Sequence, residues 1–201
     1  MPTAVETYAA LAFDTLYSKL TKSPPIPFSK LRQIVEHTDE IPSNERFPLF
    51  VTWNILRHGN KELRGCIGNF GNLKLPEGVK EYALIAALED TRFDPIKAAE
   101  LPKLSCSVTL LKNFERVDDI YDWKVGKHGI RILINGRSTA TFLPDVAVEQ
   151  GWSKEQTLQA LVQKAGYYED YKDMDIQLTR YQGIKDSLDY GEYLEIRERA
   201  S

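Results

Sequence analysis

The sequence has few cysteines, few histidines and no long apolar run, and each shortage excludes a class of protein. Two cysteines in 201 residues do not make a disulfide framework, so we expect a reducing compartment, the cytoplasm or also the nucleus. No apolar run approaches the roughly 18 residues of a membrane-spanning helix, and the N-terminal segment lacks the regions of a signal peptide. The three histidines lie apart from one another and from the cysteines, so we expect neither a metal site nor a cofactor.

Acidic residues slightly outnumber basic ones, 29 to 26, which bears on nucleic acid as a partner. The formal net charge is −3 and the isoelectric point is about 5.7. No stripe of lysine or arginine compensates for this balance, so nucleic-acid binding is not expected. Neither of the glycine-rich patterns that cradle nucleotide phosphates is present.

What the sequence does contain is a mixture of amphipathic helices and short strands in hairpin order. Helices are predicted over residues 4–20, shortly after 29, over 76–90 and after Ser153, where Gln156 completes a capping box. Strands are predicted over 49–56, 63–70, 103–117 and 175–182, with a hairpin over 128–143 around Asn135-Gly136. This order predicts an α+β fold of antiparallel sheets flanked by helices. Residues 186–201 are highly charged, and we expect a partly ordered tail there.

One strand contains the stretch "LRGCIG" at residues 63–68, which places a cysteine between glycines. Regular alternation would put Leu63, Gly65 and Ile67 on one face of the strand and Arg64, Cys66 and Gly68 on the other. The second cysteine, Cys106, shares one strand face with Leu104, Val108 and Leu110 and is expected in the core.

On this stretch the chain resembles the family named for the Alport syndrome, midface hypoplasia and elliptocytosis chromosomal region protein, the AMMECR family. The segments "AALEDTRFDP" (86–95), "ELPKLSCSVTLL" (100–111) and "LPDVAVEQGW" (143–152) agree with it. The resemblance implies one domain over residues 4–185, with one large lobe and one smaller lobe, and no settled molecular activity. It also implies partners, because prokaryotic relatives are associated with a Memo-like protein and a radical SAM protein.

Three interpretations of the "LRGCIG" stretch follow. In the first, Cys66 is a nucleophile that acts on an acyl or amide-like carbon. Arg64 would lower the pKa of its thiol, and His128 would serve as the base. In the second, a groove binds a small ligand or peptide, and its residues are Arg64, Gly65, Gly68, Asp90 and Arg92.

The third interpretation is an internal clasp, in which Arg64 pairs with Asp90 or Asp94 and Cys66 fills a small space. The preferred function is that of a binding or scaffolding component that acts with a partner. A cysteine-dependent enzyme is the alternative, and a nucleic-acid-binding regulator comes third.

Overall fold

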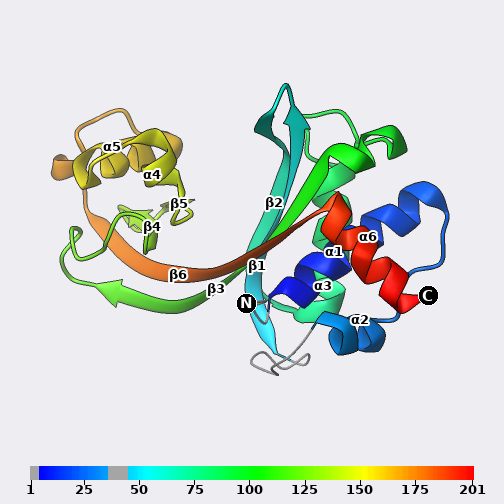
Figure 1. Ribbon diagram of the computed structural model, residues 1–201. Coiled ribbons are helices and arrows are strands. Elements are labelled where there is room, and N and C mark those ends of the chain that lie inside the picture. The colour runs from blue at the N-terminus through cyan, green and yellow to red at the C-terminus, as the bar shows by residue number, and fades with distance from the viewer. Residues whose placement is uncertain (1–4, 36–44) are drawn as a thin grey trace. The chain divides into compact units, whose positions relative to one another are not determined.

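The structure, a computed structural model, describes residues 5–35 and 45–201 and confirms the α+β fold (Figure 1). The helices in these ranges are α1 (Glu6–Thr21), α2 (Phe28–Val35), α3 (Leu75–Leu88), α4 (Val146–Gln150), α5 (Lys154–Lys164) and α6 (Tyr190–Ala200), with short 3-10 helices at Ala98–Lys103 (η1) and Tyr171–Asp173 (η2). The strands are β1 (Arg46–Arg57), β2 (Asn60–Lys74), β3 (Leu104–Val117), β4 (Gly129–Ile134), β5 (Ser138–Phe142) and β6 (Ile176–Asp189). None of these helices is long and apolar enough to cross a membrane.

The strands follow the order β2-β1-β3-β6-β4-β5, so β2 is an edge strand. β1 pairs antiparallel with β2 and β3, and β4 pairs antiparallel with β5 and β6. The chain divides into two compact units of unequal size. The larger unit runs up to Leu110 and resumes at Ile184, and the smaller unit is Leu111–Gly183, so β3 and β6 each contribute to both.

The core of the larger unit forms where α1 and α3 pack on one face of β1. The inward residues of β1 alternate as expected for a half-buried strand, and Val51 and Trp53 are fully buried. The Trp53 indole donates a 3.0 Å hydrogen bond to the Ala83 carbonyl of α3, which satisfies its polar group inside the core. Phe13 of α1 lies edge-on to the same indole, with ring centroids 5.3 Å apart. Cys106 is buried in this core, as predicted.

The expectation of a partly ordered tail over residues 186–201 is wrong, because these residues complete β6 and form α6. Asp189 and Glu192 make a reciprocal capping box at the start of α6. Tyr193 is fully buried, stacks on Phe13 at 4.8 Å and donates a 2.7 Å hydrogen bond to the Asp14 carboxylate. The charged residues of this segment therefore belong to a helix, and the buried face of that helix packs into the core.

The smaller unit confirms the two local signals predicted in it. Asn135 and Gly136 both have positive φ, 50° and 66°, as the tight turn between β4 and β5 requires. The capping box of Ser153 and Gln156 opens α5. A separate hydrophobic core forms where α5 packs over β4 and β6.

Candidate functional site

The "LRGCIG" stretch lies in β2, and a β-bulge at Arg64 breaks its regular alternation. Trp53 of β1 pairs with Gly65 and Asn54 pairs with Leu63, so Arg64 is an extra residue without a partner in β1. Because cross-strand neighbours share a face, the bulge places Leu63 on the same face as Cys66. The predicted grouping of Leu63 with Gly65 and Ile67 is therefore wrong. Alternation is a period-two rule, and one inserted residue reverses it.

Gly65 and Gly68, the two glycines predicted to line a binding groove, pack closely against neighbouring backbone and side chains. A Cβ at Gly65 would collide with the carbonyl oxygen of Ala86, so α3 packs directly on the strand at this point. A Cβ at Gly68 would collide with the Phe50 ring and the Leu49 carbonyl of β1. The structure thus explains these glycines by close packing within the larger unit.

Arg64 is buried, with 7% of its surface exposed, and its charge is already paired. Its Nε and Nη2 donate to the two carboxylate oxygens of Glu100 at 2.9 and 3.2 Å. Its Nη1 donates to the backbone carbonyl of Asp94 at 2.7 Å. The clasp interpretation expected Asp90 or Asp94 to provide the partner carboxylate. That prediction is wrong, because the carboxylate belongs to Glu100. This bidentate pair fastens β2 to η1, and the bond to Asp94 fastens it to the segment before η1.

Asp90 and Arg92 bind the two backbone groups of Cys66 that β1 leaves free at the sheet edge. The Asp90 Oδ2 accepts a 2.9 Å hydrogen bond from the Cys66 amide. The Arg92 Nη2 donates to the Cys66 carbonyl at 3.1 Å and to the Asp90 Oδ2 at 2.7 Å. The two side chains therefore supply what a neighbouring strand would supply at this position. We call this group, Cys66, Asp90 and Arg92, the edge clasp.

The electrostatics of the edge clasp are dominated by the buried Asp90 carboxylate, of which only 3% is exposed. Hydrogen bonds from the Arg92 side chain, followed by those from the Cys66 and Arg92 amides, hold the pKa of Asp90 well below its usual range. The Arg92 side chain is 56% exposed and keeps its charge toward solvent. Its guanidinium also lies 5.5 Å from the centre of the Phe93 ring.

Cys66 itself is half-buried, and its sulfur lies 3.1 Å from the Thr52 hydroxyl on β1. Burial raises the pKa of the Cys66 thiol, and this effect outweighs the Thr52 hydrogen bond and the Arg92 charge. The expected direction of the shift is therefore wrong. The predicted cause is absent too, because Arg64 is neutralised by Glu100. Thr52 was missed from the sequence because only the β1–β2 register brings it to Cys66.

His128, the predicted base, belongs to the smaller unit and lies directly before β4. Its Nδ1 accepts a 2.9 Å hydrogen bond from the Lys124 amide, and burial lowers the pKa of its imidazole. In the neutral ring the proton is then on Nε2, so the remaining nitrogen is a donor. This tautomer is the wrong one for a base that acts through Nε2.

No group of three or more histidine, cysteine, aspartate or glutamate residues within 5–35 and 45–201 could hold a metal ion. The edge clasp contains a single carboxylate, and that carboxylate is committed to Arg92 and to backbone amides. What the site offers chemically is a fixed guanidinium beside a weakly acidic thiol.

The chain is similar to known proteins over most of its length. A family model described as AMMECR1 matches residues 9–185. An uncharacterised protein of Kluyveromyces lactis is 39% identical over 92% of both chains, and one of Saccharomyces cerevisiae is 37% identical over 96% of this chain and 89% of its own. An uncharacterised protein of Arabidopsis thaliana is 40% identical over the same shares.

A solved structure is also similar to this chain. The crystal structure of an uncharacterised protein from Pyrococcus horikoshii matches with a TM-score of 0.73 and 27% identity. The match covers 92% of this chain and 91% of that one. The similarity therefore extends over almost the whole fold.

Proposed function

The chain belongs to the AMMECR1 family, and we propose that it is a binding component whose edge clasp holds a carboxylate-bearing ligand, such as an acidic peptide. In this proposal Arg92 provides the ligand contact, Asp90 positions Arg92, and Cys66 lines the site. The protein acts with a partner that uses or delivers the ligand. The partner suggested by the resemblance is a Memo-like protein, with a radical SAM protein in prokaryotic relatives.

The observation that carries the proposal is the state of the Arg92 side chain. Its Nε and Nη2 are bound to Asp90 and Cys66, whereas its Nη1 has no hydrogen-bond partner within the part of the chain that the structure describes. A guanidinium already fixed by a buried carboxylate loses little conformational freedom when it binds an anion. Exposure and preorganisation together favour recognition of a carboxylate.

Cysteine chemistry has less support at this site. A nucleophilic cysteine needs a depressed pKa or an adjacent base. Burial raises the pKa of the Cys66 thiol, and the hydroxyl beside it belongs to Thr52. Neither feature activates a thiol, so binding is the function that the geometry supports best.

The proposal is tested by NMR titration of the isotope-labelled full chain with acetyl-triglutamate amide. The triglutamine analogue serves as the neutral probe. We expect saturable shifts at the Arg92 and Cys66 amides with the acidic peptide only. The Arg92→Lys variant keeps the positive charge but loses the planar guanidinium that can donate two parallel hydrogen bonds. Its affinity for the acidic peptide should therefore fall about tenfold.

The matched control is Arg57→Lys, because Arg57 is also half-exposed and also pairs with a carboxylate, that of Glu62. This variant should bind the acidic peptide like the wild type. Equal binding of both peptides, or equal losses in the two variants, would overturn the proposal. Thermal melts of each variant establish that a lost signal is not lost folding.

A further inference from the structure

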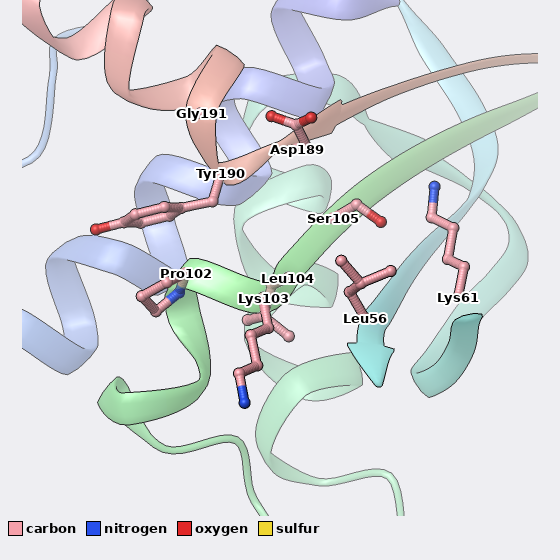
Figure 2. Close-up of a pocket in the computed structure, with 9 residues that line it drawn as sticks. All are labelled: Leu56, Lys61, Pro102, Lys103, Leu104, Ser105, Asp189, Tyr190 and Gly191. Carbon is pink, nitrogen blue, oxygen red and sulfur yellow. The ribbon is translucent and has the colours of Figure 1, made fainter. Parts of the chain in front are cut away.

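A separate cavity of about 430 Å³ lies in the larger unit, where β6 passes into α6 (Figure 2). Its walls come from the β1–β2 hairpin, the junction of η1 and β3, and the first residues of α6. No residue of the edge clasp lines it. The volume falls within the range of small-molecule sites, which is roughly 300–1,000 Å³.

The wall contributed by β3 presents a hydroxyl, that of Ser105, on a mostly buried residue. Ser105 is only 7% exposed, and its side chain makes no hydrogen bond to any residue of the described ranges. In Figure 2 the Ser105 oxygen points toward the side of the cavity formed by Lys61 and Leu56. The Ser105 oxygen is not among the buried atoms that lack a partner, so it can be reached from the cavity and can bond a molecule held there.

The charges around the cavity favour an anion. Lys61 and Lys103 contribute two ammonium groups, and Asp189 contributes one carboxylate. The Asp189 Oδ1 already accepts the Glu192 amide at 2.9 Å as the cap of α6. The Gly191 amide lies in the first turn of this helix, where amides have no acceptor within the helix and the dipole is positive.

The remaining wall is apolar. Leu56 exposes half of its surface at the hairpin, and Pro102 and Leu104 line the cavity on either side of Lys103 in the chain. An exposed leucine beside a cavity with fixed polar groups is typical of a site for an amphipathic ligand. Water alone would satisfy Ser105 but would leave this apolar surface wet.

We infer that this cavity binds a small organic anion. Its carboxylate or phosphate group would contact Lys61, the Ser105 hydroxyl and the first turn of α6, and its apolar part would cover Leu56 and Leu104. This site is independent of the edge clasp, because the two share no residue.

The test is an NMR titration of the labelled full chain with phenylacetate, phenyl phosphate and, as the neutral analogue, benzyl alcohol. We expect saturable shifts at the Gly191 and Ser105 amides with the anions and none with the alcohol. The tighter anion identifies the headgroup as carboxylate or phosphate. Lys61→Gln should weaken binding about tenfold, because it removes a charged hydrogen bond from an exposed residue that the fold does not need.

The matched control is Lys80→Gln, which removes the same charge from an exposed position of α3 outside the cavity. It should leave the affinity of the cavity for the anions unchanged. Arg92→Lys should also leave this affinity unchanged, so the test of the cavity is independent of the test of the edge clasp. Binding of benzyl alcohol as tight as that of the anions would overturn the inference. The absence of saturable shifts up to about 10 mM would overturn it as well, because a millimolar complex is visible there.

Discussion

Replacing Asp90 with asparagine changes one oxygen of a carboxylate that accepts four hydrogen bonds, from the amides of Cys66 and Arg92 and from two nitrogens of the Arg92 guanidinium. Asparagine keeps one acceptor oxygen and puts an NH₂ group in place of the other. In either orientation that NH₂ group faces donors, the Arg92 guanidinium together with the Cys66 amide or with the Arg92 amide. The negative charge that orients Arg92 is lost in the same step.

The expected cost is about 3 kcal/mol of unfolding free energy. A hydrogen bond to a charged group contributes about 1.5–3 kcal/mol, and a buried donor left unpaired costs about 1–3 kcal/mol. The Arg92 side chain is 56% exposed and regains water, so its ion pair adds little to this sum. In a chain of this size, about 3 kcal/mol lowers the melting temperature by about 6–12 °C.

Two measurements examine the prediction together. Urea unfolding gives the loss of global stability, and hydrogen exchange gives the opening at the Cys66 amide. If the edge clasp holds β2 locally, exchange at this amide accelerates about 100-fold in Asp90→Asn. The matched control is Asp94→Asn in the same segment, because Arg64 contacts the Asp94 backbone carbonyl and the substitution leaves that contact in place. A loss below about 1 kcal/mol with unchanged exchange at Cys66 would refute the reasoning.

Two further predictions concern protons. Because the folded pKa of Asp90 is depressed, its contribution to stability is present above the unfolded pKa of about 3.9 and is lost as the pH falls toward the folded value. Urea unfolding at pH 6 and pH 3 should therefore show a larger acid loss in the wild type than in Asp90→Asn, and equal losses would contradict this. Because burial raises the pKa of Cys66, iodoacetamide labelling followed by mass spectrometry should be slow at neutral pH and rise only under alkaline conditions, with Cys106 labelled only on unfolding. Fast labelling of Cys66 at neutral pH would favour the enzyme alternative instead.

The parts of the fold that were predicted correctly depend on contacts between near neighbours in the sequence. The Asn135-Gly136 turn needs only two residues with positive φ, and the α5 cap needs only Ser153 and a glutamine three positions later. The strand containing Cys106 was recognised because apolar and polar residues alternate in the sequence from Leu104 to Leu110. Such signals survive folding because no distant segment is required to complete them.

The parts that failed depend on partners far along the chain. Arg64 binds Glu100, 36 residues away, and nothing local to either residue predicts that pairing. The α6 helix was predicted as a tail because its many charged residues are visible in the local sequence. The contact that anchors it, from Tyr193 to Asp14, joins residues 179 positions apart and is not. The capping pair of Asp189 and Glu192 was the one local sign of this helix, and it lay inside the charged segment.

The polar and glycine residues of the "LRGCIG" stretch are each engaged by a neighbour, and this limits what the site can do. Arg64 is bound to Glu100, Gly65 adjoins Ala86, the Cys66 backbone is bound by Asp90 and Arg92, and Gly68 adjoins Phe50. These contacts therefore hold the edge strand β2 in place. Two groups at the edge clasp stay accessible, the Arg92 guanidinium and part of the Cys66 thiol. A guanidinium discriminates ligands by their negative charge, and a thiol of raised pKa discriminates little. A screen that varies the anionic group of the ligand should therefore separate binders from non-binders, whereas a screen that varies an electrophilic carbon should not.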